Sequence, residues 1–176
     1  MVQFLLVLLV LHPSLAQLEV EPPLLMLLNL ELVPLLNEQM VLCVSTEHPW
    51  SHRRRIDIND LQDSPMVVYE SGYFIRSKLD QLCADRSVQP DFRMQSNFLP
   101  LLLKMVKQGM GTTVGLKIMS EEEPGIVGIP LSPKTEVSMA LAKRRGRTIS
   151  RANQAFLDWA VTIPGDRAKQ VIGAEI

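Results

Sequence analysis

Small polar residues follow three short apolar stretches of the chain, at points where strands are expected to end. These residues are Ser45, Ser71, Gly72, Ser96 and Asn97. Where a helix begins, serine hydroxyls and unpaired backbone amides can together hold an anion, often a carboxylate. The same residue types are also common helix N-caps. Taken singly, each residue favours a cap, whereas the three groups together leave both interpretations open.

Residue types that perform catalysis or hold metal ions are few and scattered. The three histidines, His12, His48 and His52, form no HExxH array or similar cluster. The sequence contains no G-x-S-x-G nucleophile motif. Gly109 and Gly111 fall between an expected helix and an expected strand, the reverse of the order that a dinucleotide-binding fingerprint requires. We therefore expect no enzyme activity, no metal ion and no cofactor.

The two cysteines, Cys43 and Cys83, lie far apart, and each falls within an apolar run. In that setting a thiol most often packs as a small hydrophobic group. The number and spacing of the cysteines indicate neither a zinc site nor a disulfide framework. A single disulfide between them is the less favoured alternative.

The composition is that of a packed globular protein without a strong net charge. Hydrophobic residues make up 47% of the 176 residues, charged residues make up 21%, and the formal net charge is −1. A free-standing nucleic-acid binder usually carries a clear positive excess, because neutralising phosphates supplies most of its affinity. The apolar run at residues 4–11 is too short to span a bilayer. We therefore expect neither direct DNA binding nor membrane insertion by this chain.

An alternating pattern of strands and helices occupies residues 38–130. Strands are expected at residues 40–44, 65–69, 92–95 and 112–116, and helices at residues 75–83 and 98–106. Ser71 is the expected N-cap of the first helix, and Phe98 is expected in the buried stripe of the second. Short strand–helix–strand connections imply parallel pairing with right-handed crossovers. Ligands of such sheets bind beyond the carboxyl ends of the strands, where the small polar residues lie.

The segments on either side of this region are less regular. Residues 1–37 are strongly apolar, and the run at residues 4–11 favours either a buried strand or the core of an export signal spanning residues 1–16. No Lys or Arg precedes the run, which speaks against export. Residues 131–162 are expected to form a strand and a helix, and residues 163–176 a tail. The apolar face predicted for that helix consists of Ala152, Ala155, Phe156, Trp159 and Ala160.

Four stretches carry a resemblance to a known family. They are residues 40–49 (MVLCVSTEHP), 69–79 (YESGYFIRSKL), 96–115 (SNFLPLLLKMVKQGMGTTVG) and 139–159. In this order the sequence resembles the effector-binding domain of LysR-type bacterial transcription regulators. The resemblance implies an α/β fold similar to that of periplasmic binding proteins, with one nearly complete parallel-sheet lobe and part of a second lobe.

The same resemblance implies a division of the chain. Residues 38–130 are expected to form effector-binding lobe II, and residues 131–162 the return strand and C-terminal helix of lobe I. Residues 1–37 are expected to supply a remnant strand and crossover of lobe I. The family's helix-turn-helix has no counterpart in this sequence. We therefore expect DNA binding only through a helix-turn-helix domain absent from this chain.

The resemblance also implies which residues contact the effector. By position they are Ser45, Ser71, Gly72, Tyr73, Ser96, Asn97, Thr112 and Thr113. The implied effector is a small organic anion, and the implied regulator is a cytoplasmic homo-oligomer. Two alternatives stay open. One is a secreted solute-binding protein of the same fold, exported if residues 1–16 are a signal peptide, and the other is a non-functional fragment.

Overall fold

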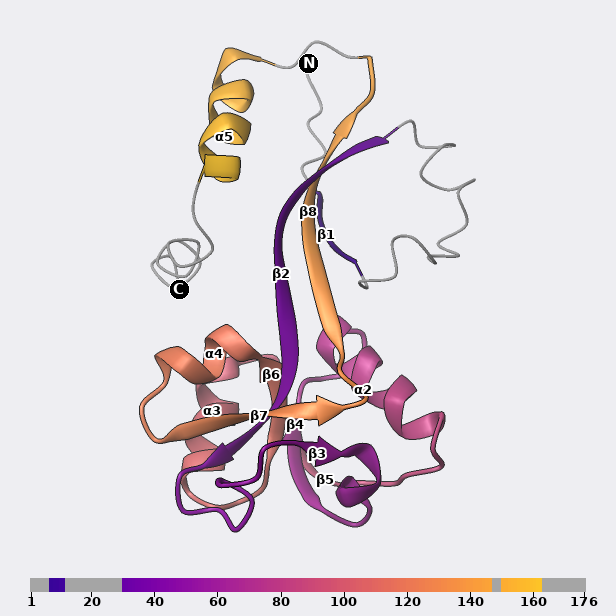
Figure 1. Ribbon diagram of the computed structural model, residues 1–176, viewed down its shortest axis with the longest axis vertical. Coiled ribbons are helices and arrows are strands. Elements are labelled where there is room, and N and C mark those ends of the chain that lie inside the picture. The colour runs from indigo at the N-terminus through magenta and orange to yellow at the C-terminus, as the bar shows by residue number, and fades with distance from the viewer. Residues whose placement is uncertain (1–6, 12–29, 147–149, 163–176) are drawn as a thin grey trace. The chain divides into compact units, whose positions relative to one another are not determined.

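The computed structural model describes residues 7–11, 30–146 and 150–162 (Figure 1). Most of the predicted export signal at residues 1–16 and the whole predicted tail at residues 163–176 lie outside the described residues.

The chain separates into two compact units, and each is described by itself. Residues 39–135 form the unit that we call the central unit. Residues 1–38 and 136–176 belong to the other, which we call the flanking unit. Strand β2 (Leu30–Ser45) runs through both, with its first part in the flanking unit and its last part in the central unit.

The central unit contains a mixed sheet and several helices. After β2 its elements are β3 (Ile56–Asp57), the 3-10 helix η1 (Ile58–Leu61), β4 (Pro65–Val68), α2 (Phe74–Ala84), β5 (Asp91–Gln95), α3 (Leu99–Lys107), β6 (Thr113–Leu116), α4 (Lys117–Glu122) and β7 (Ile126–Ser132). Strand β5 pairs in parallel with β4, and a parallel bridge joins Met66 of β4 to Thr112 just before β6. Strands β6 and β7 pair antiparallel with β2, and β3 pairs in parallel with β7. The strand order is therefore β5-β4-β6-β2-β7-β3.

The strand–helix–strand–helix–strand pattern predicted from the sequence is confirmed in β4, α2, β5, α3 and β6. Strand β5 lies on one side of β4, and β6 lies on its other side. Two right-handed crossovers in these opposite directions place α2 and α3 on opposite faces of the parallel strands.

The sequence pattern grouped β2 with the parallel strands, but β2 runs in the opposite direction to them. It pairs antiparallel with β6, with Met40 opposite Leu116 and Cys43 opposite Thr113. The chain that leaves β2 leads through a loop to β3, which lies beyond β7. No crossover helix therefore joins β2 to β4, and nothing forces the two strands to point the same way.

A hydrophobic core packs between α3 and one face of the sheet. Its buried members are Val41, Cys43, Val67, Tyr69, Leu102, Leu103, Val106 and Ile126. The strand residues alternate and the helix residues recur at three- and four-residue spacing, as one buried face requires. Phe98, predicted in this stripe, is instead 52% exposed. It is the N-cap of α3, where its extended backbone (φ −102°, ψ 96°) turns the side chain away from the helical stripe.

The flanking unit contains β1 (Val7–Leu11), β8 (Glu136–Arg144) and α5 (Arg151–Thr162), together with the first part of β2 (Figure 1). Strand β1 pairs antiparallel with β8, which agrees with the strand interpretation of the first apolar run. The apolar face predicted for α5 is largely exposed: Phe156 is 40% and Trp159 is 46% exposed, whereas Leu157 is buried.

Within the described part of the chain, the helices are all too short or too polar to cross a bilayer.

Candidate functional site

Two loops lie side by side where the parallel strands β4 and β5 end. The register places Val68 of β4 opposite Gln95 of β5, so the two strands stop at the same level. The backbone amide of Ser96 donates to the carbonyl of Val68 at 3.1 Å, which ties the loops together. We call residues 69–73 and 96–98 the carboxyl edge of the central unit.

The topology makes this edge the natural place for a ligand. The chain leaves β4 toward β5 on one side and returns past β4 to β6 on the other. Connections that leave in opposite directions create a crevice beyond the strand ends, and ligands of open α/β sheets bind there. The loop after β4 belongs to the carboxyl edge and lies at the strand ends where these two connections diverge.

Most polar residues of the carboxyl edge are exposed to solvent. Ser71, Gly72 and Asn97 are exposed. The Ser96 hydroxyl accepts a hydrogen bond from the backbone amide of Phe98 at 3.1 Å, so it braces the loop that leads into α3. Gly72 has φ +97°, a left-handed conformation that glycine adopts without strain, and a Cβ there would meet no atom within 4 Å.

Neither helix that starts at this edge is capped by a side chain. The N-cap of α2 is Tyr73, not Ser71 as predicted, and it makes no side-chain cap hydrogen bond. The N-cap of α3 is Phe98, which makes none either. The first amides of a helix have no intrahelical partner and carry the positive end of the helix dipole. At the start of α2 these amides are open to an anion, whereas in α3 Pro100 has no N–H and the Leu101 amide donates to the carbonyl of Phe98 at 3.1 Å.

Two tyrosines stack beside the start of α2. The rings of Tyr69 and Tyr73 lie 5.9 Å apart between centroids, with 25° between their planes. Tyr69 is buried, and burial raises the pKa of its phenol to about 12. Tyr73 remains 43% exposed. Tyr69 thus supports the ring of Tyr73 from the core, and the ring of Tyr73 is exposed to solvent.

Arg76 fixes the end of β4 to helix α2. Its side chain is buried, and its Nη1 donates to the carbonyl of Tyr69 at 3.0 Å. Its Nε is 2.8 Å from a carboxylate oxygen of Asp80, and its guanidinium lies 4.3 Å from the centroid of the Phe92 ring. The sequence reasoning missed Arg76. The available signal was its spacing, because it lies three residues before Leu79 and seven before Cys83 on the buried side of the helix.

The structure does not bring Ser45, Thr112 and Thr113 to the carboxyl edge. Ser45 ends β2, which runs antiparallel to β6, so it lies at the edge where β6 begins. Thr112 and Thr113 stand at that same start of β6 and are fully buried. The hydroxyl oxygens of both threonines have no hydrogen-bond partner among the described residues. Of the eight predicted residues, the structure therefore groups five: Ser71, Gly72, Tyr73, Ser96 and Asn97.

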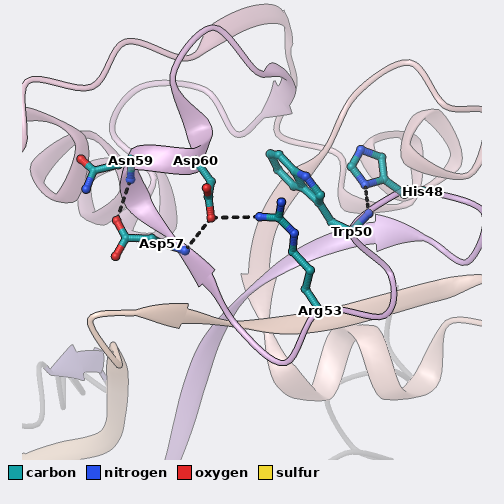
Figure 2. Close-up of polar contacts among 6 residues, drawn as sticks. All are labelled: His48, Trp50, Arg53, Asp57, Asn59 and Asp60. Atoms are coloured by element: carbon teal, nitrogen blue, oxygen red, sulfur yellow. Dashed lines mark hydrogen bonds and ion pairs between the residues drawn. The ribbon is translucent and has the colours of Figure 1, made fainter.

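A separate polar network braces the loop that follows β2 (Figure 2). The backbone amide of Trp50 donates to Nδ1 of His48 at 3.1 Å, and burial lowers the pKa of this histidine. The Arg53 guanidinium lies over the Trp50 ring at 5.3 Å and donates to Asp60 at 3.1 Å. Asp60 also accepts from the backbone amide of Asp57. These groups hydrogen-bond to one another, and the network thereby stabilises the loop.

The two thiols are placed where they react poorly. Cys43 belongs to the core on the α3 side of the sheet, and Cys83 is buried on α2. Burial raises the pKa of the Cys43 thiol to about 12 and that of Cys83 to about 11. Both thiols are therefore protonated near neutral pH. Among the described residues, no three histidine, cysteine or acidic side chains gather in a way that could hold a metal ion.

Comparisons with known proteins agree on one family. A family model described as the LysR substrate binding domain matches residues 20–162. The hydrogen peroxide-inducible genes activator of Pectobacterium carotovorum subsp. carotovorum is 30% identical over 130 residues, which are 72% of this chain and 43% of that protein. The DNA-binding transcriptional dual regulator OxyR of Escherichia coli strain K12 is 28% identical over 118 residues, 65% of this chain and 39% of that protein. The chain thus spans less than half the length of these relatives.

Solved structures show the same fold. The CcmR regulatory domain of Synechocystis PCC6803, in complex with 2-PG, matches with a TM-score of 0.72 and 18% identity over 90% of this chain and 74% of that chain. The effector-binding domain of QuiR, in complex with shikimate, matches with a TM-score of 0.65 and 25% identity over 82% of this chain and 66% of that chain.

Proposed function

The chain belongs to the LysR substrate-binding domain family, and from that premise we propose that it binds a small organic anion at the carboxyl edge of the central unit. The observation that supports this site most directly is the meeting of two loops at adjacent strand ends, one of which leads into the uncapped start of α2. Free amides and serine hydroxyls offer hydrogen-bond donors to a carboxylate without a buried counter-charge. The residues proposed to contact the effector are Ser71, Gly72, Tyr73, Ser96 and Asn97.

Two structural relatives in complex with small molecules support a small effector. The CcmR domain is described with 2-PG and the QuiR domain with shikimate, a cyclic carboxylate. We carry over to this chain only the chemical class, a small organic anion, because the identities are low. The fold and family also favour a regulator over the secreted solute-binding protein, since the relatives that match are transcription regulators.

The wider role is part of the same proposal. The domain works in a LysR-type regulator that is a cytoplasmic homo-oligomer, binds DNA through a separate helix-turn-helix domain and catalyses no reaction. In such an arrangement the effector shifts the population of two conformations of the regulator, and its differential affinity for them sets the size of the response. Residues 38–130 are proposed to be lobe II, and residues 1–37 and 131–162 to contribute to lobe I.

A response to hydrogen peroxide through a thiol is the alternative suggested by the names of several relatives. Peroxide oxidises thiolates, and reactive cysteines are accessible and have a lowered pKa. Both cysteines of this chain are buried, with a raised pKa. The burial of both thiols therefore favours sensing by reversible ligand binding.

The proposal is tested with Ser71→Ala, because the Ser71 side chain is exposed and its removal leaves the fold intact. Shikimate and other small carboxylates are expected to raise the melting temperature of the chain, since a ligand that binds the native state stabilises it. The variant is expected to bind about tenfold more weakly, from the loss of a hydrogen bond to a charged group. Ser51→Ala, in the loop that joins β2 to β3, is the matched control and is expected to bind normally. Equal binding by both variants would remove Ser71 from the site.

A further inference from the structure

Two exposed aromatic side chains stand at the carboxyl edge. Tyr73 is 43% exposed and Phe98 is 52% exposed. Among the large hydrophobic residues described in the central unit, Met110 is the one other with comparable exposure. The exposed aromatic residues of that unit thus lie on the two loops that leave the adjacent ends of β4 and β5.

Helix stability does not explain these residues. Both occupy N-cap positions with extended backbones, Tyr73 at φ −75° and ψ 138° and Phe98 at φ −102° and ψ 96°. Ser, Thr, Asp and Asn are favoured at N-caps because their side chains accept hydrogen bonds from first-turn amides, and an aromatic ring cannot do so. Each position thus forgoes a stabilising cap and leaves an apolar ring in water. Both rings lie on loops at adjacent strand ends, where ligands of open α/β sheets bind.

The Tyr73 ring is held in position from behind. Tyr69 stacks against it at 5.9 Å and is itself buried in the core. The carbonyl of Tyr69 accepts from Arg76, and the amide of Tyr73 donates to the carbonyl of Glu70. A ring that is already ordered loses little conformational freedom when a second flat group packs against it. Tyr73 is therefore suited to stacking on a ligand.

We propose that Tyr73 and Phe98 select the effector by its ring, so that the domain prefers an aromatic carboxylate to an aliphatic one. This inference rests on the proposed function, because it assigns the carboxylate of the ligand to the amides and hydroxyls of the same edge. Aromatic pairs prefer offset-stacked or edge-to-face contacts and gain affinity beyond the area that they bury. The exposed rings supply that contact on the side of the ligand away from its charge.

The test compares three probes of equal charge on the whole chain: benzoate, cyclohexanecarboxylate and propionate. Affinity is measured by isothermal titration calorimetry, with amide chemical shifts as a second readout. Benzoate is expected to bind about tenfold more tightly than propionate, and measurably more tightly than cyclohexanecarboxylate. Tyr73→Ala and Phe98→Ala are each expected to lower benzoate affinity several-fold and to leave propionate affinity nearly unchanged. Phe156→Ala removes an exposed aromatic residue of α5 and serves as the control.

The other possible results of this titration distinguish a failure of the ring preference from a failure of the anion site. Equal affinity for all three probes, unaffected by Tyr73→Ala or Phe98→Ala, would overturn the ring preference and leave the anion site standing. Equal affinity for benzoate and cyclohexanecarboxylate would show that bulk apolar contact, not an aromatic ring, is selected, which also overturns the inference. Binding of none of the probes, with no response to any small carboxylate by the unaltered chain, would overturn both the inference and the proposed function.

Discussion

At the scale of single residues, burial separates groups that can meet a ligand from groups that cannot. Ser71 and Asn97 are exposed at the carboxyl edge, whereas Thr112 and Thr113 are fully enclosed at the start of β6. All four are small polar residues, and the sequence makes them look alike. Burial depends on which edge of the sheet each residue occupies, and that follows from strand direction rather than residue type.

The two cysteines lead to a testable prediction about their reactivity. At pH 7.5 the folded chain is expected to resist millimolar hydrogen peroxide, with no added oxygen on Cys43 or Cys83 by mass spectrometry. Burial raises the pKa of each thiol, so the thiolate that peroxide attacks is scarce and enclosed. The same thiols are expected to react in urea, where the chain is unfolded. Rapid oxidation of the folded chain would contradict the placement of both side chains.

The raised pKa values also fix the direction of a pH effect. Each thiol ionises at 9.0 in its ordinary state but at about 12 (Cys43) and about 11 (Cys83) when folded. Their contribution to folding is therefore complete below pH 9.0 and is lost as the pH rises through 11 and 12. Tyr69, raised from 10.0 to about 12, acts in the same direction.

At the scale of elements, the sequence predicted the parallel part of the fold well. Periodic apolar residues and the Pro and Gly that interrupt them located α2, α3 and the strands around them. It did not predict α4 or β7. Helix α4 has six residues, too few for a 3.6-residue period to appear. Strand β7 contains Pro130, a residue that argues against a strand in the interior of a sheet.

The candidate site was predicted in part for the same reason. Residues after β4 and β5 come together because parallel strands end at one edge, and the helices between those strands reveal that they are parallel. No local sequence pattern indicates the direction of β2, because a short apolar run has the same pattern in a parallel and in an antiparallel strand. Ser45 was therefore grouped with residues from which the antiparallel pairing separates it.

The link between β4 and α2 gives a prediction at this scale. Arg76→Ala is expected to lower the free energy of unfolding by about 1–3 kcal/mol, because it removes packing and leaves the Tyr69 carbonyl without its donor. Arg93→Ala is the matched control, since Arg93 also pairs with an aspartate but is exposed. Its loss is expected to cost about 0–1 kcal/mol. Urea unfolding monitored by circular dichroism measures both, and equal effects would contradict the role given to Arg76.

In the whole molecule, the family match includes the unit in which the candidate site lies. The family match covers residues 20–162, and therefore includes the whole central unit. Within that unit two loops with exposed polar residues meet at the carboxyl edge. At the opposite edge, which we call the far edge, β2 ends and β6 begins, and Thr112 and Thr113 are fully buried. The two edges thus differ in what they offer a ligand.

Amide chemical-shift mapping during titration with shikimate and benzoate distinguishes the two edges. The largest shifts are expected at Ser71, Gly72, Tyr73, Ser96 and Asn97, and at the amides of the first turn of α2. The amides of Ser45, Thr112 and Thr113 are expected to move little. Saturable shifts concentrated at the far edge, or an unchanged spectrum at high concentrations of both anions, would contradict the proposed site.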